Sequence, residues 1–135
     1  MDPLYAQAYL AKGISLYELK RYPQAIEECD KFLKINPQNI KAIQYKISSL
    51  YQLKKYPEVL NLSNELLAIN QNDIDILDLK GRTLSNLGRY DDELKCCDRI
   101  LEIDPKNIRA LIRKSYVYGT YLEGMNKILN VVIEF

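Results

Sequence analysis

The fold is decided by one stretch, Gly81-Arg-Thr-Leu-Ser-Asn-Leu-Gly-Arg-Tyr-Asp-Asp-Glu-Leu-Lys-Cys-Cys-Asp-Arg-Ile-Leu-Glu-Ile-Asp-Pro105. Apolar residues recur every three or four positions on both sides of Gly88, which is the spacing of two amphipathic helices. Glycine commonly ends a helix and proline cannot continue one, so Gly88 and Pro105 mark the two helix ends. Two helices of this size cannot bury their apolar faces alone. The stretch therefore needs neighbours of the same kind.

Such neighbours occur at a period of 34 residues. The columns in register include Asp2, Asn36, Asn70 and Asp104; Pro3, Pro37, Gln71 and Pro105; Gly13, Ile47, Gly81 and Ser115; Leu16, Leu50, Leu84 and Tyr118; and Tyr22, Tyr56 and Tyr90. A period of this size indicates a stacked repeat array. In these columns the chain resembles the tetratricopeptide repeat (TPR) family, from Ala6 to about Asn126. The resemblance implies an all-α fold, a right-handed α-solenoid of antiparallel helix pairs.

We expect one solenoid domain with three full repeats and a degenerate fourth. The expected boundaries are 1–135 for the domain and 6–39, 40–73, 74–107 and 108–135 for the repeats, with 1–5 resembling the end of a preceding repeat. Repeat 2 carries Ile47 and Val59 where small residues are expected, so its two helices should lie further apart or tilt relative to each other. Repeat 3 carries Glu93 in the crowded column that holds Ala25 in repeat 1 and Val59 in repeat 2, which we call the alanine column. We expect that carboxylate to lean to solvent or to pair with a nearby lysine or arginine.

Repeat 4 departs from the pattern in its second half. A first helix is expected from Arg109 to about Tyr121, followed by a turn near Gly124 with one extra residue. The second helix would then carry Ile128, Leu129, Val132 and Phe135. An apolar end of this kind predicts truncation, self-association or docking against another domain.

Composition argues against several classes of function. The chain has 19 basic and 18 acidic residues, so no strong field favours nucleic acid or an anionic membrane. It has no histidine and no Gly-x-Gly-x-x-Gly, phosphate-cradling or nucleophile-elbow motif, so we expect neither an enzyme nor a cofactor or metal site. Cys29 and Cys97 lie two repeat lengths apart and are read as small core residues. Three cysteines and the absence of a signal peptide indicate a reducing, cytoplasmic location.

The TPR resemblance implies a scaffold or adaptor that binds a protein or peptide. In that family the first helix of each repeat lines a concave groove. The groove residues implied for this chain are Leu10, Ile14, Tyr17, Lys41, Gln44, Tyr45, Ser48, Tyr51, Asp75, Asp78, Arg82, Arg109 and Arg113. Tyrosine suits a recognition surface because it offers a large contact area and a polar tip. The alternative, that these tyrosines fill the core between repeats, stays open.

Family members that bind the acidic C-terminal tails of heat-shock chaperones hold them with lysine, asparagine and arginine. The corresponding positions here are Leu10, Ile14, Tyr45, Asp75 and Leu79, so this ligand class is disfavoured. An alternative function is a non-catalytic targeting or assembly module of a larger enzyme or complex. RNA binding by helical repeats is less favoured, because it needs a basic groove.

Overall fold

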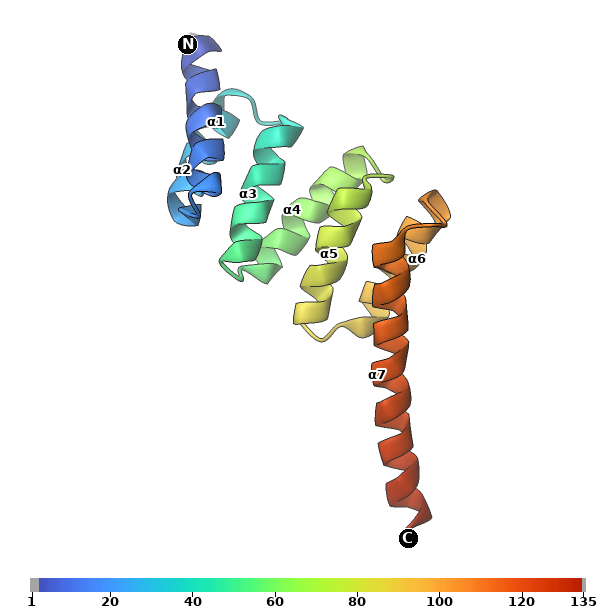
Figure 1. Ribbon diagram of the computed structural model, residues 1–135. Coiled ribbons are helices and arrows are strands. Elements are labelled where there is room, and N and C mark those ends of the chain that lie inside the picture. Colours follow the sequence, from blue (N-terminus) through green and yellow to red (C-terminus); the bar gives the residue numbers. More distant parts are fainter. Residues whose placement is uncertain (1–2, 135) are drawn as a thin grey trace. The chain divides into compact units, whose positions relative to one another are not determined.

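The computed structural model describes residues 3–134, which form seven α-helices and no strand (Figure 1). The helices are α1 (Pro3–Glu18), α2 (Tyr22–Ile35), α3 (Ile40–Gln52), α4 (Tyr56–Ile69), α5 (Ile74–Asn86), α6 (Tyr90–Ile103) and α7 (Ile108–Ile133). The predicted all-α fold is confirmed. Pro3 begins α1, whereas Pro37 and Pro105, which stand in the same column of the repeat, lie in turns. None of these described helices is long and apolar enough to cross a membrane.

The helices group into two compact units, unit 1 at Met1–Gln71 and unit 2 at Asn72–Phe135. In unit 1, α1 packs against α2, α2 against α3, and α3 against α4, and α1 also contacts α3. In unit 2, α5 packs against α6, and α6 packs against α7. Each unit has a core of its own. Fully buried side chains include Phe32, Ile47, Leu50 and Val59 in unit 1, and Leu84, Ile100 and Val117 in unit 2.

The helices that open repeats 2 to 4 begin in the same way. Asn39, Asp73 and Asn107 lie 34 residues apart and precede α3, α5 and α7. In each case the side-chain oxygen accepts a hydrogen bond from the backbone N–H three residues later, over 2.9, 3.2 and 3.0 Å. Asparagine and aspartate are preferred N-caps because they satisfy one of the free N–H groups of the first turn. The same period thus fixes where these helices start.

Each of the first three repeats turns through a residue with a positive φ. Lys20, Lys54 and Gly88 occupy one column and have φ values of 60°, 60° and 71°. The N–H of the following residue donates to the carbonyl five positions earlier, over 2.9, 3.0 and 2.9 Å, which closes the end of the helix. The expected role of Gly88 as a helix terminator is confirmed. The two lysines adopt the same left-handed conformation at a steric cost that glycine does not have.

Replacing Lys54 with glycine is therefore expected to raise the free energy of unfolding by about 1 kcal/mol. The matched control is Lys55→Gly, which removes the same charge at the next residue, where φ is −86°. That variant should not be stabilised. Urea denaturation of both variants measures the difference. Equal effects at the two positions would show that the left-handed turn carries no strain.

Two columns set how closely the paired helices approach. Gly13 and Ala25 meet between α1 and α2, where a Cβ on Gly13 would lie 3.1 Å from the Cys29 sulfur. In repeat 2 the two columns hold Ile47 and Val59, and both side chains are fully buried. There α3 and α4 are in less extensive contact than α1 and α2, or α5 and α6, as the bulk of these residues predicts. The weaker contact agrees with the local distortion expected for repeat 2.

The cysteines are core residues, as the repeat spacing predicts. Cys29, Cys96 and Cys97 are buried and free. Burial raises the pKa of the Cys29 and Cys97 thiols to about 11, so both are protonated at neutral pH. A protonated, buried thiol packs as a small apolar group and is a poor nucleophile.

The expected division of repeat 4 into two helices is wrong. The structure continues one helix, α7, from Ile108 to Ile133, and the predicted turn at 122–124 lies within it. The earlier repeats turn before Pro23, Pro57 or Asp91, but no proline follows the corresponding position in α7. A lone glycine such as Gly124 costs a helix only about 1 kcal/mol, so nothing interrupts the hydrogen-bond ladder. Phe135, which was assigned to the second helix, lies outside the described residues.

Candidate partner-binding surfaces

The predicted groove residues fall on the first helices of the repeats, in both units. The predicted residues of unit 1, on α1 and α3, are called surface 1. Those of unit 2, on α5 and α7, are called surface 2. Surface 1 comprises Ile14, Tyr17, Lys41, Gln44, Tyr45 and Ser48. Surface 2 comprises Asp75, Asp78, Arg82, Arg109 and Arg113.

Two predicted groove residues on these helices have side chains that pack within unit 1. Leu10 is only 7% exposed and belongs to a core cluster with Phe32 and Ala42, so its side chain is not available to a partner. Tyr51 is half-buried, and its ring packs against Tyr56 with the centroids 5.9 Å apart. We therefore leave both residues out of surface 1.

Surface 1 is built around a tyrosine cluster. The ring of Tyr17 packs edge to face against Tyr45 at 5.4 Å and against Tyr22 at 5.6 Å. Burial raises the pKa of Tyr17, and a hydrogen bond with the Ser48 side chain partly offsets this rise. Edge-to-face pairs of this kind add about 0.5–1.5 kcal/mol beyond the area they bury. The Tyr17 ring thus serves both the packing of α1 on its neighbours and the surface.

A cavity of about 540 Å³ lies on the α3 side of this cluster. It is lined by Ile40, Lys41, Gln44, Tyr45 and Ser48, which recur on one face of α3. The lining combines one cation, neutral hydrogen-bonding groups and the face of a ring. Such a lining suits a peptide segment, because it can satisfy backbone groups while packing apolar side chains.

Surface 2 contains a network of charged side chains. Arg113 of α7 reaches Asp78 of α5, with Nη2 3.0 Å from Oδ1, and its Nη1 donates to the Asp78 carbonyl over 3.1 Å. Arg82 contacts the other oxygen of the same carboxylate at 3.3 Å. Asp78 is itself buried. The two arginines therefore stabilise a carboxylate that would be costly to bury alone.

The same arginine pairs with Glu93, the acid in the alanine column. Glu93 is only 1% exposed, and its Oε1 lies 3.5 Å from Arg113 Nε. Burial raises the pKa of Glu93, while Arg113 and a hydrogen bond with Ser85 act to lower it. Of the two expectations for this residue, pairing with a basic side chain is confirmed and leaning to solvent is wrong.

Gly81 makes room for this pairing. A Cβ added at Gly81 would lie 2.7 Å from Arg113 Nη1, which is closer than two such atoms can approach. Sequence analysis alone missed the connection, since the three residues come from α5, α6 and α7. The sequence did contain a signal for this ion pair, because it has an acid, Glu93, in the alanine column and an arginine, Arg113, in a groove column.

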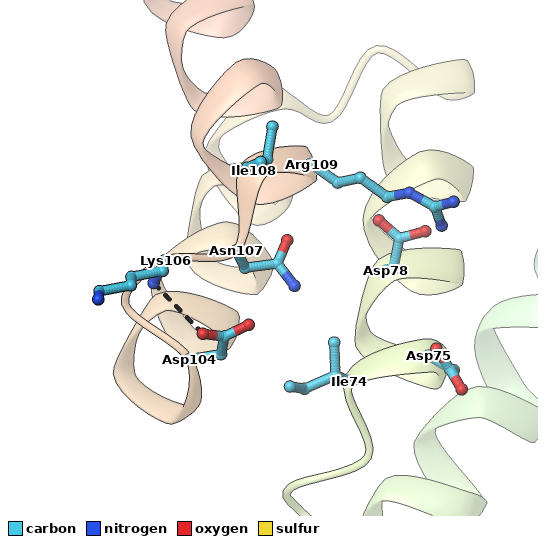
Figure 2. Close-up of a pocket in the computed structure, with 8 residues that line it drawn as sticks. All are labelled: Ile74, Asp75, Asp78, Asp104, Lys106, Asn107, Ile108 and Arg109. Atoms are coloured by element: carbon cyan, nitrogen blue, oxygen red, sulfur yellow. Dashed lines mark hydrogen bonds between the residues drawn. The ribbon is translucent and has the colours of Figure 1, made fainter.

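A hollow of about 340 Å³ in unit 2 is bordered by the N-terminal end of α5 (Figure 2). Its lining residues are Ile74, Asp75, Asp78, Asp104, Lys106, Asn107, Ile108 and Arg109. Figure 2 shows the Arg109 side chain extending over Asp78, and Asp104 accepting a hydrogen bond from the backbone N–H of Lys106 at 3.3 Å. The charges here are mixed, and Asp75 is exposed. This hollow lacks the uniformly basic lining that a carboxylate-rich tail requires.

Comparison with solved structures shows a common fold at low identity. The first TPR of Spaghetti (RPAP3), bound to the HSP90 peptide SRMEEVD, is 21% identical over 90% of this chain and 97% of that chain, with a TM-score of 0.79. MamA is 19% identical over 89% of this chain and 70% of that chain, with a TM-score of 0.80. The TPR domain of Arabidopsis OM64 is 16% identical over 85% and 95%, with a TM-score of 0.76.

The repeats themselves are recognised in the sequence. No curated protein matches the chain significantly. Tetratricopeptide repeat models match residues 6–39 and 74–107, which are the boundaries expected for repeats 1 and 3. Together these matches cover half of the chain, and they agree with the helix pairs α1–α2 and α5–α6. The chain belongs to the tetratricopeptide repeat family, whose domains are protein–protein interaction modules.

Proposed function

We propose that surface 1 holds a segment of a partner protein, packed over Tyr45 on the exposed side of α3. The observation that carries this proposal is the cavity of about 540 Å³ beside the Tyr17–Tyr45 pair. Tyrosine side chains dominate many interfaces because they bury a large area while losing little rotamer freedom. Gln44 and Ser48 offer hydrogen bonds to a peptide backbone at the same place.

Truncating Tyr45 to alanine is expected to weaken partner binding by about 1–3 kcal/mol. The partner is first captured by a photo-crosslinking amino acid placed at Gln44, and the crosslinked peptide then serves as the ligand in calorimetry. The control for crosslinking is the same amino acid at Asn61, an exposed position of α4 outside the surface. Contact more than charge should supply the affinity, so binding should weaken little between about 50 and 300 mM salt.

Tyr51→Ala is the matched control for the binding measurement. It removes an identical side chain from the same helix, but Tyr51 packs on Tyr56 and does not line the cavity. We expect this variant to melt at a lower temperature and to bind normally while folded. Surface 1 is the wrong site if Tyr45→Ala binds as well as the parent, or if Gln44 and Asn61 crosslink the same peptides.

The remaining features of the proposed function follow from chemistry already described. We propose that the module is non-catalytic, because its thiols are buried and protonated and its sequence has no histidine. These reduced thiols also favour a cytoplasmic location. Nucleic acid and membrane surfaces are disfavoured as partners by the formal net charge of +1.

The chemistry of the partner is narrowed further by the positions at which other family members hold the acidic tails of heat-shock chaperones. The solved relative that carries an HSP90 peptide suggests a chaperone tail as one ligand. In this chain Leu10 and Leu79 occupy two of these positions and are buried, and Asp75 places a negative charge at a third. We therefore propose a ligand other than an acidic C-terminal tail.

A second candidate function is an assembly module within a larger complex, and α7 favours it. Met125, Ile128, Leu129 and Val132 are each more than half exposed on the second half of this helix. Exposed apolar patches of this kind mark sites of self-association or of docking against another domain. Sedimentation of the chain and of an Ile128→Lys variant tests self-association, which the charge should abolish.

A further inference from the structure

A cavity of about 420 Å³ in unit 2 is bordered by α5, α6 and α7. It is lined by Ser85, Glu93, Arg109, Ile112, Arg113 and Tyr116. Ile112 and Tyr116 are 64% and 69% exposed. They lie with Arg109 on the solvent side, whereas Glu93 is fully enclosed. The lining therefore combines an exposed, partly apolar rim with a buried carboxyl residue.

The repeat period explains why this space is open. Ser85 and Arg113 stand two repeat lengths after Tyr17 and Tyr45. In unit 1 the two tyrosine rings occupy these columns and pack edge to face at 5.4 Å. In unit 2 a serine replaces the first ring, and the guanidinium of the arginine turns to Glu93 and Asp78. One aromatic ring is thus missing from a place that the repeat architecture can fill with one.

The carboxyl group of Glu93, one of the lining residues, has an unsatisfied acceptor. Glu93 Oε2 is buried and has no hydrogen-bond partner among the described residues. The carboxyl group has its ion pair through Oε1 to Arg113, and Ser85 contributes a hydrogen bond. Buried polar atoms are rarely left unpaired, because each carries its full desolvation cost. A hydrogen-bond donor supplied by a ligand would satisfy this oxygen.

The charges around the cavity favour a neutral donor. Arg113 is already shared between Asp78 and Glu93, and Arg82 also pairs with Asp78, so the two carboxylates face two cations. A carboxylate or phosphate would meet Glu93 at close range, and an ammonium group would meet Arg109 and Arg113. A hydroxyl group carries no such penalty.

We propose that this cavity is a subsite for a tyrosine side chain of the partner. Its ring takes the space that Tyr17 fills in unit 1, and its phenolic hydroxyl donates to Glu93 Oε2. The rim residues Ile112 and Tyr116 contact the adjoining backbone and neighbouring side chains. The proposal rests on the proposed function, since it names the chemistry of a partner segment, but it concerns unit 2 and not surface 1.

The probe is N-acetyl-L-tyrosinamide, titrated into the folded, ¹⁵N-labelled chain and followed by NMR. We expect saturable shifts in the amide signals of Ser85 and Tyr116 and in the Arg113 Nε–H signal. The dissociation constant should be on the order of 1 mM for a fragment of this size. N-acetyl-L-phenylalaninamide lacks only the hydroxyl and should bind about tenfold more weakly, because it leaves Glu93 Oε2 unpaired.

Ser85→Tyr provides the sharpest control. It places a ring in the column from within the chain, as Tyr17 does in unit 1, and should abolish binding of the probe while the chain stays folded. Ser85→Ala keeps the cavity open and should retain binding. A fold check by circular dichroism accompanies both variants.

The proposal is overturned if the tyrosine probe gives no saturable shifts, or if both probes bind equally. It is also overturned if Ser85→Tyr binds as the parent does, or if N-acetyl-O-phosphotyrosinamide binds more tightly than the unmodified probe. Failure here leaves the function of surface 1 untouched, because crosslinking from Gln44 and the effect of Tyr45→Ala are measured in unit 1.

Discussion

Replacing Arg113 with methionine is expected to lower the free energy of unfolding by about 3–5 kcal/mol at neutral pH. The reason is that Glu93, only 1% exposed, loses the cation with which it pairs. Asp78 loses one of its two arginine partners and keeps Arg82. Methionine preserves most of the length and the apolar stem of arginine, so the loss of charge dominates. Urea denaturation followed by far-ultraviolet circular dichroism measures the effect.

The size of the loss should depend on pH. Burial has already raised the pKa of Glu93, and Arg113 acts to lower it, so removing Arg113 raises the pKa further. A carboxyl group whose pKa is higher in the folded state stabilises that state when protonated, and this contribution is lost as the pH rises through the folded value. The penalty should therefore be smallest near the ordinary glutamic acid pKa of 4.5 and grow toward neutral pH.

A second substitution tests the assigned cause. Adding Glu93→Val to Arg113→Met places in repeat 3 the residue that repeat 2 carries in the same column, Val59. Replacing a buried ion pair with apolar groups is often close to neutral, so the double variant should recover most of the lost stability. The pairing has no energetic weight if Arg113→Met alone costs less than about 1 kcal/mol, or if valine at position 93 restores nothing.

Replacing Gly81 with leucine is expected to cost about 2 kcal/mol or more. Its first added atom would lie 2.7 Å from Arg113 Nη1 and 3.5 Å from the Cys96 Cβ, so the guanidinium must leave its place beside Asp78 and Glu93. The cost then combines overpacking with an uncompensated buried acid. Thermal and urea denaturation of the variant give its size.

Gly119→Leu is the matched control, because a Cβ at that position has no atom within 4 Å. It adds the same side chain at an exposed position away from the ends of α7 and should stabilise the chain by about 0.5–1 kcal/mol through helix propensity. A similar loss at both positions would mean that leucine is harmful for a reason other than crowding at the helix crossing.

The sequence was most informative where a single column decides local geometry. Gly88 predicted the left-handed turn after α5, and the cysteine columns predicted buried thiols. Lys20 and Lys54 adopt the same conformation without the residue type that announces it. At these two positions the 34-residue period predicted the turn, because equivalent positions of successive repeats adopt the same conformation.

It was less informative where burial depends on what lies opposite. Leu10, Asp78 and Ile112 occupy one column, yet they are 7%, 8% and 64% exposed. The repeat fixes the direction of a side chain, but contact with the next repeat decides whether water reaches it. Leu10 packs with Ala42 of α3 and Asp78 pairs with Arg113 of α7, whereas no described helix follows α7, which carries Ile112. For the same reason the tyrosines could not be divided between core and surface in advance.

In repeat 4 the period predicted a helix end that the local sequence does not enforce. The turn expected near Gly124 requires the chain to abandon a regular hydrogen-bond ladder, and neither proline nor a left-handed residue forces it to do so within α7. The period alone favours a break there, while local helix propensity favours continuation. Continuation needs no compensating contact from a second helix.

The division into two compact units has a consequence for unfolding cooperativity. In a repeat protein the intrinsic stability of each part and the coupling between adjacent parts are separate quantities, and the coupling decides whether the chain melts as one. Both Arg113 and Gly81 belong to unit 2, so their loss weakens one part while Phe32, Ile47 and Val59 still hold the other. Under such a local weakening the two-state description fails first, and a single midpoint no longer reports the stability of the whole chain.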